Sequence, residues 1–250
     1  MAITISVANQ KGGVGKTTTA QTMASILGEK KNKVLLIDMD SQLNSTFISG
    51  ANESKKTMTS VLDRKIKLKD AIIKCTYYDL LCADEDIAMW EKYKGDEIDH
   101  SLLQKLLAAV QEDYDFIVID TPPALGNLLL LSLVASNYVI IPTDPRPLAI
   151  KGMDALNATI KAVKTEKKDF KILGILLVKH NERSVLNRQL KELLMERAEL
   201  MDTTVFNTFI RDSIAVPESQ LMCEPLVEYA PKSNPCIDYE SFVNEVLKMI

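Results

Sequence analysis

Cysteine is scarce in this chain of 250 residues, and the few cysteines present are too scattered for a disulfide framework. They are Cys75, Cys82, Cys223 and Cys236, and none forms a C-x-x-C pair or a cluster with the two histidines. Isolated thiols in a chain of this length are typical of a reduced, cytosolic protein. The first residues contain no basic region and no cleavage site of a secretory leader. We therefore expect a cytoplasmic protein.

An excess of positive charge and a long apolar run are also missing. The chain has 30 Lys and Arg residues and 34 Asp and Glu residues, which gives a formal net charge of −4. No global positive field therefore draws the chain to nucleic acid or to an anionic membrane, and any such binding needs a local basic patch. The longest apolar stretch, residues 128–135, is far too short to cross a bilayer.

Strand and helix patterns alternate along the chain, and no linker, repeat or low-complexity segment interrupts them. Runs rich in Ile, Val and Leu predict buried strands at residues 3–8, 33–38, 116–120, 138–142 and 172–178, with a weaker candidate at 78–82. Helices are predicted at 16–31, 101–112, 149–168, 184–199 and 239–249. This alternation predicts an α/β fold with a doubly wound, mostly parallel sheet flanked by helices. We expect one domain over residues 1–250.

A glycine-rich segment separates the first predicted strand from the first predicted helix. It contains Lys11, Gly12, Gly13, Val14, Gly15, Lys16, Thr17 and Thr18. Glycines allow a tight turn whose N–H groups point inward and bind phosphate, above the N-terminus of the following helix. In this context Lys16 is expected to reach the β- and γ-phosphates of ATP, and the Thr17 hydroxyl to ligate Mg²⁺.

The segment departs from the usual phosphate-loop pattern G-x-x-x-x-G-K-[ST]. The first glycine of that pattern would fall at position 10, where this chain has Gln10. An additional lysine, Lys11, stands directly before the glycine pair. Three aspartates follow buried strands: Asp38 and Asp40 after one, and Asp120 at the end of another. Ligands bind at the carboxyl ends of strands in open α/β sheets, so Asp120 is expected to hold Mg²⁺ or its water. A chance glycine loop, with aspartates that only cap turns, is the alternative.

These residues carry a resemblance. K-G-G-V-G-K-T-T at 11–18, D-M-D-S-Q at 38–42 and I-D-T-P-P at 119–123 resemble motifs of the ParA/MinD superfamily of deviant Walker-A ATPases. L-V-E-Y-A-P-K-S at 226–233 resembles the C-terminal part of small Soj-like partition ATPases. The resemblance implies slow, Mg²⁺-dependent ATP hydrolysis in an ATP-sandwich homodimer. It also implies that Lys11 reaches the partner's nucleotide, Thr18 contacts the α-phosphate, Asp40 positions the attacking water, and Asp38 supports Mg²⁺ and the adjacent switch segment.

The chain also departs from these relatives. Ser41 stands where they usually have proline, and Ala215 aligns with a common arginine. Their I-P-R segment near the adenine aligns with residues 210–212. From this alignment alone, Phe209, Ile210 and Arg211 are expected to lie near the adenine.

The resemblance favours plasmid or chromosome partition as the biological role. The ATP dimer would bind DNA non-specifically, associate with the nucleoid, and be stimulated by a ParB-like centromere-binding partner. Such binding needs basic side chains that contact phosphates. The candidates are two clusters, the first comprising Lys161, Lys164 and Lys168, the second Arg183, Arg188 and Lys191. Ordinary solvated side chains on amphipathic helices are an equally good reading of either cluster.

Other members of the superfamily provide the alternatives. A MinD-like membrane switch needs a basic amphipathic C-terminal helix, whereas residues 240–250 carry more acid than base and have the period of a docked helix. No stable membrane anchor is therefore expected, although positioning of a protein cargo stays open. Iron–sulfur reductases need paired cysteines at a dimer interface, and the related tyrosine kinases have a tyrosine-rich tail. A scaffold without turnover is disfavoured by Asp40.

Overall fold

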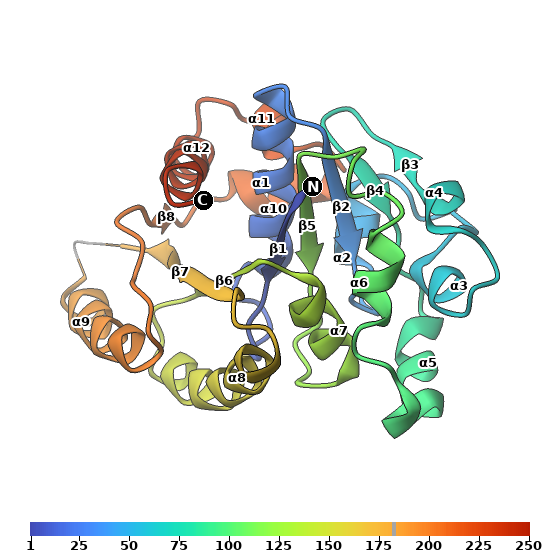
Figure 1. Cartoon of the computed structure of the whole chain (residues 1–250). Helices are drawn as coiled ribbons and strands as arrows, with labels where there is room; N and C mark the ends of the chain where they lie inside the picture. The colour runs from blue at the N-terminus through green and yellow to red at the C-terminus, as the bar shows by residue number, and fades with distance from the viewer. Residues whose placement is uncertain (182–183) are drawn as a thin grey trace.

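The computed structural model describes residues 1–181 and 184–250, and its centre is an eight-stranded sheet (Figure 1). The strand order is β3-β4-β2-β5-β1-β6-β7-β8, and all neighbours are parallel except the β3–β4 pair. The strands are β1 (Ile3–Val7), β2 (Val34–Asp38), β3 (Ile73–Lys74), β4 (Asp79–Leu81), β5 (Phe116–Asp120), β6 (Tyr138–Thr143), β7 (Lys171–His180) and β8 (Ile210–Arg211). The predicted doubly wound, mostly parallel fold is confirmed.

Helices cover both faces of this sheet. They are α1 (Lys16–Glu29), α2 (Asn44–Ile48), α3 (Met58–Leu62), α4 (Leu68–Ala71), α5 (Asp86–Lys94), the 3₁₀ helix η1 (Gly95–Glu97), α6 (Leu102–Leu107), α7 (Asn127–Ala135), α8 (Pro147–Glu166), α9 (Val185–Leu200), α10 (Ala215–Leu221), α11 (Leu226–Tyr229) and α12 (Asn234–Leu247). In Figure 1, α1, α11 and α12 lie above the sheet, and α7 and α8 lie below it.

Alternating strand residues build separate cores on the two faces. Leu36 and Val118 pack with α1 and α12 in one cluster, whereas Leu35 and Ile119 pack with α6 and α7 in another. Successive side chains of a strand point to opposite faces, and here both faces are covered. This double burial explains why the strands are apolar throughout instead of alternating with polar residues.

The observed elements differ from the predicted ones in length and in number, since helices such as α5, α7 and α10 were not among those predicted. The weak candidate at 78–82 is β4, which lies between β3 and β2 in the sheet. The two-residue strands β3 and β8 were not predicted, because so short a segment has no readable periodicity. The helix predicted at 101–112 is regular only over α6, and turns follow it.

The C-terminal helix α12 is docked on the domain, as the sequence predicted. Tyr239, Phe242 and Val246 are buried against the α1 side of the sheet. The Tyr239 hydroxyl lies 3.1 Å from the hydroxyl of Thr19 on α1. Within residues 1–181 and 184–250, no helix combines the length and the apolar character needed to cross a bilayer.

Candidate active site

The chain between β1 and α1 forms a tight loop at the carboxyl end of β1. Gly13 and Gly15 have φ angles of 73° and 77°, in the left-handed region that glycine adopts without a steric cost. Val14 is fully buried and fastens the loop to the core. A Cβ atom on Gly12 would meet no heavy atom within 4 Å. The loop therefore has the conformation of a phosphate-binding nest above the N-terminus of α1.

Lys16 is the first residue of α1 and is almost completely buried. Its ammonium group donates a hydrogen bond to the Lys11 carbonyl at 3.3 Å. Burial lowers the pKa of Lys16, while the charges of Asp120 and Asp40 raise it. The loop thus holds a cation between the expected phosphate position and the strand-end carboxylates.

Asp38 and Asp120 meet because β2 and β5 are neighbours and these two residues pair in register. Burial raises the pKa of both carboxyl groups, and the charge of Asp120 raises that of Asp38 further. Ser45 donates to Asp120 Oδ2 at 2.8 Å. Among the described residues, Asp120 Oδ1 has no hydrogen-bond partner although it is buried. Crowded carboxylates of this kind are stabilised by a cation.

The fit of this group to Mg²⁺ can be judged from its donors. Mg²⁺ takes one or two carboxylates together with phosphate and water oxygens. The unpartnered Asp120 Oδ1 has this chemistry, and the hydroxyl of Thr17 lies close enough to lower the pKa of Asp120 through a hydrogen bond. Asp120 and Thr17 therefore fit the ion.

Asp38, also expected to support Mg²⁺, accepts hydrogen bonds with both carboxylate oxygens. Its Oδ1 accepts from the Asp40 amide at 3.1 Å, and its Oδ2 accepts from the amide and hydroxyl of Thr46, both at 2.8 Å. Both oxygens are thus already bound to the segment that leads into α2. Asp38 therefore fixes the chain between β2 and α2 through these hydrogen bonds.

Asp40 lies at the entrance of α2, on the wall of the pocket described next. Its Oδ1 accepts from the Gln42 amide at 3.1 Å, and only 6% of the residue is exposed. Burial raises the pKa of Asp40, while the Gln42 amide and the charge of Lys16 lower it. The Asp40 carboxylate is thus held in place on the pocket wall beside the phosphate loop.

A pocket of about 890 Å³ opens beside the phosphate loop. Its lining includes Gly12, Gly13, Gly15, Lys16, Thr17, Thr18, Asp40, Lys179, Ile210, Arg211, Asp212, Pro217 and Gln220. Gln220 of α10 donates to the Thr18 hydroxyl at 2.9 Å, so α10 closes the pocket against α1. Sequence reasoning missed α10 and Lys179, because nothing in their local pattern indicates a ligand.

Two of the three residues expected near the adenine line this pocket. Phe209 does not; its ring instead packs on His180 with centroids 4.9 Å apart. Phe209 precedes a strand residue whose side chain points the opposite way, which corrects the expectation for it. Ile210 and Arg211 lie on the wall, but the Arg211 guanidinium is bound to Asp238 of α12, with Nη2 2.6 Å from Oδ1.

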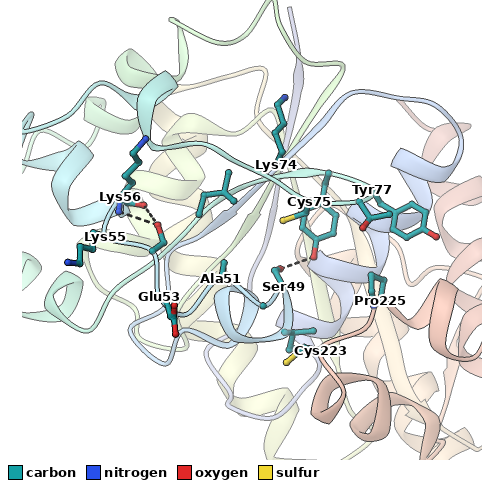
Figure 2. Close-up of a pocket in the computed structure, with 16 residues that line it drawn as sticks. Ser49, Ala51, Glu53, Lys55, Lys56, Lys74, Cys75, Tyr77, Cys223 and Pro225 are labelled. Carbon is teal, nitrogen blue, oxygen red and sulfur yellow. Dashed lines mark hydrogen bonds between the residues drawn. The ribbon is translucent and has the colours of Figure 1, made fainter.

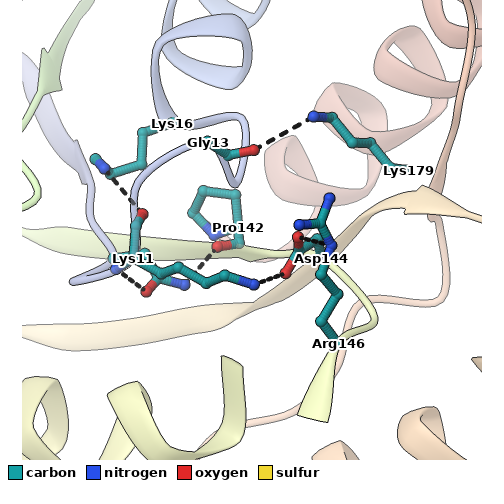
Figure 3. A network of polar contacts seen from close by, with 8 residues as sticks. Lys11, Gly13, Lys16, Pro142, Asp144, Arg146 and Lys179 are labelled. Atoms are coloured by element: carbon teal, nitrogen blue, oxygen red, sulfur yellow. Dashed lines mark hydrogen bonds and ion pairs between the residues drawn. The ribbon is translucent and has the colours of Figure 1, made fainter. Parts of the chain in front are cut away.

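Lys11 points away from the phosphate pocket of its own chain. Its ammonium group lies 2.7 Å from Asp144 Oδ1, and Arg146 Nε lies 2.9 Å from Asp144 Oδ2 (Figure 3). Asp144 is buried just after β6. The sequence held a signal for it, since it is an aspartate that follows a buried strand, as Asp38 and Asp120 do.

The basic cluster predicted on residues 149–168 does not form one continuous face. Lys161 is exposed on α8, but Lys164 is half-buried and lies 3.6 Å from Asp202. Lys168 follows the end of α8, which ends at Glu166. Lys167 turns inward and donates to the Ser136 carbonyl at 2.7 Å. The prediction that the three lysines lie on one face of a single helix is therefore wrong.

The second predicted basic cluster lies around the start of α9. Arg188 is exposed and Lys191 is half-buried on this helix. Arg183 lies outside the described residues.

A second pocket, of about 640 Å³, lies between the end of α2 and the β3–β4 hairpin (Figure 2). Lys55, Cys75 and Cys223 are among its lining residues. Burial raises the pKa of the Cys75 thiol, which disfavours the reactive thiolate. No residue of the phosphate loop is among the residues that line this pocket.

Comparisons with known proteins agree with this geometry. Residues 2–172 match a family model described as an AAA domain. Sporulation initiation inhibitor protein Soj of Bacillus subtilis is 33% identical over 249 residues, which cover 97% of this chain and 97% of Soj. Chromosome partitioning protein ParA of Myxococcus xanthus is 31% identical over 250 residues, covering 98% of this chain and 87% of that protein. Cobyrinic acid a,c-diamide synthase from Mycobacterium smegmatis, solved with bound ADP and magnesium, superposes with a TM-score of 0.82 at 28% identity, covering 99% of this chain and 95% of that one.

Proposed function

Since this chain belongs to the AAA-domain family of ParA/MinD-type P-loop ATPases, we propose that it is a partition ATPase that dimerises with ATP. The observation that carries the proposal is the phosphate loop headed by Lys11, with Asp120 at the end of β5 and Asp40 two residues after the adjacent strand β2. In the proposed cycle, the ATP dimer binds DNA non-specifically, and a ParB-like centromere-binding protein stimulates hydrolysis. The single domain is residues 1–250.

ATP and Mg²⁺ are the cofactors of this site. The amides of the loop from Gly12 to Thr18 bind the phosphates, with Lys16 at the β- and γ-phosphates. Asp120 and Thr17 would hold Mg²⁺, and the ion would neutralise charge on the phosphate oxygens. Asp38 supports this arrangement from behind, through its hydrogen bonds to Asp40 and Thr46.

Hydrolysis in this proposal is in-line attack of water on the γ-phosphate. Asp40 orients the water, and Lys16 stabilises the charge on the transferring group. Asp40→Ala should therefore bind ATP and dimerise, but lose turnover. Normal turnover in this variant would remove Asp40 from the reaction.

Lys11 acts across the dimer in this proposal, on the nucleotide of the partner subunit. To do so it must exchange its ion pair with Asp144 for the partner's phosphates. A partner subunit could approach the loop at Gly12, because a Cβ atom there would meet nothing within 4 Å in its own chain. Gly12→Val should consequently fold and bind ATP, yet fail to dimerise. Unchanged ATP-dependent dimerisation, measured by light scattering, would contradict the sandwich.

DNA binding is proposed for the exposed basic residues beside α8 and α9. Lys161 and Lys168 are the best placed, because both are exposed and neither pairs with a carboxylate among the described residues. Replacing both with glutamine should weaken DNA binding and make it less dependent on salt, by a slope of about one for each lost phosphate contact. The matched control replaces the exposed Lys55 and Lys56 with glutamine on another part of the surface.

The deciding experiment uses purified Asp40→Ala protein, because it is expected to hold ATP without turnover. Its binding to arbitrary duplex DNA and to anionic liposomes is measured with Mg²⁺·ATP, Mg²⁺·ADP and no nucleotide, across a salt series. Salt-sensitive DNA binding that requires ATP is the expected result. ATP-dependent binding to liposomes alone would favour a MinD-like membrane switch, which the docked helix α12 disfavours. Binding to neither would indicate a protein cargo and contradict the DNA step.

A further inference from the structure

Lys179 occupies an unusual position at the end of β7. Its φ angle is +54°, in the left-handed region that side-chain-bearing residues rarely adopt. The pairing of β7 with β8 shifts register here, since Val178 pairs with Ile210 and His180 with Arg211. Lys179 is thus the extra residue of a β-bulge. Bulges of this kind redirect a side chain and are frequent beside active sites.

The bulge brings this lysine to the phosphate loop. Its ammonium group donates to the Gly13 carbonyl at 3.3 Å, and its side chain lines the same pocket as Lys16 and Thr17 (Figure 3). The preceding residue also touches the loop, because a Cβ atom on Gly15 would lie 3.5 Å from the Val178 side chain. The end of β7 therefore forms part of the wall around the phosphate position.

Lys179 differs from the other cationic residues of this pocket because no carboxylate among the described residues balances its charge. Three cationic side chains, Lys16, Lys179 and Arg211, are among the residues that line it. The charge of Lys16 is balanced by Asp40 and Asp120, and Arg211 is bound to Asp238. Lys179 is exposed, and in the part of the chain that the structure describes it contacts a neutral carbonyl and no carboxylate. It is the cation at this pocket whose charge is still available to an anion.

We propose that Lys179 is an additional phosphate-binding residue of the nucleotide site. It holds the loop at Gly13 and supplies a further ammonium group to the polyphosphate chain of the nucleotide bound in its own subunit. This role rests on the proposed function only in requiring a nucleotide in the pocket. The strained backbone is then the cost of aiming the ammonium group at the loop, a common arrangement at ligand sites.

The test compares three substitutions of Lys179 with one control. Lys179→Met removes the charge and keeps the stem, Lys179→Arg keeps the charge, and Lys179→Gly removes the charge and relieves the backbone. Lys171→Met is the matched control, because Lys171 is an exposed lysine at the opposite end of β7. Dissociation constants for Mg²⁺·ATP, Mg²⁺·ADP and adenosine are measured by calorimetry at several salt concentrations, together with the melting temperature of each variant.

Lys179→Met should weaken Mg²⁺·ATP binding about tenfold, the loss expected for one charge-assisted contact in a partly exposed site. Adenosine, which has no phosphate, should bind as before, and Lys179→Arg should recover most of the ATP affinity. Lys179→Gly should melt at the same temperature as the unchanged protein or higher, and still bind ATP as weakly as Lys179→Met. The glycine variant therefore distinguishes loss of the ammonium charge from loss of folding stability.

Two results would overturn the assignment. In one, Lys179→Met binds Mg²⁺·ATP within about twofold of the unchanged protein. In the other, adenosine binding falls as much as ATP binding, which would make Lys179 a support of the loop alone. Failure of the unchanged protein to bind Mg²⁺·ATP would defeat the proposed function together with this inference. Normal ATP binding without any DNA binding would defeat only the partition role.

Discussion

Thr46 of α2 links Asp38, at the end of β2, to the chain that follows β4 through one buried hydroxyl group. Its Oγ1 donates to Asp38 Oδ2 at 2.8 Å and accepts from the Ala83 amide at 3.0 Å. Only 3% of the residue is exposed, so water cannot replace either partner. Thr46→Val keeps the shape of the side chain and removes both hydrogen bonds.

The expected loss can be worked out from these contacts. A hydrogen bond to a charged group contributes about 1.5–3 kcal/mol, and a buried amide left without an acceptor costs about 1–3 kcal/mol. The extra buried methyl group of valine offsets about 0.8 kcal/mol. Thr46→Val should therefore lower the free energy of unfolding by about 3 kcal/mol. At about 2–4 °C per kcal/mol for a chain of this size, the melting temperature should fall by roughly 6–12 °C.

The assay is thermal unfolding followed by circular dichroism, without nucleotide or Mg²⁺, because ligands that bind the folded state would mask the difference. Thr46→Ser is the control; it keeps the hydroxyl group and loses one methyl group, for a cost of about 1 kcal/mol. A valine variant as stable as the unchanged protein, or a serine variant less stable than the valine variant, would refute the role of the hydroxyl group.

Two further substitutions test the packing around the site. Gly28→Ala would place a Cβ atom 1.7 Å from the Tyr77 carbonyl oxygen. This substitution should therefore lower the free energy of unfolding, measured by urea titration, by about 3 kcal/mol or more. Gly12→Ala is the control, because a Cβ atom there meets nothing within 4 Å, and equal urea midpoints of the two variants would contradict the clash. Asp238→Ala removes the partner of Arg211, whose side chain is 42% exposed, so a loss of only about 1 kcal/mol is expected. By the same titration, a smaller loss in Asp238→Asn would assign the difference to the hydrogen bonds that an amide oxygen still accepts, whereas an equal loss would assign the effect to the charge. An unchanged urea midpoint in Asp238→Ala would contradict the contribution of this contact.

Much of the nucleotide site was readable from the chain because its parts are local or follow a rule of topology. The loop from Lys11 to Thr18 is one continuous segment, and its glycines specify its conformation. The proximity of Asp38 and Asp120 could be predicted, because parallel strands end at the same edge of a sheet. Phe209 could not be assigned, since an alignment shift of one residue in a strand turns the side chain to the other face.

The sequence by itself determined the alternation of strands and helices, the phosphate loop and the carboxylates at the strand ends. These depend on residue type and on spacings of a few positions, which act before any distant segment is in place. Tertiary structure alone decided the pairing of Lys11 with Asp144, of Arg211 with Asp238, and the approach of Lys179 to Gly13. Each of these contacts joins segments far apart in the chain. No local pattern can encode such contacts, because they form only where the packed sheet brings strand ends and loops together.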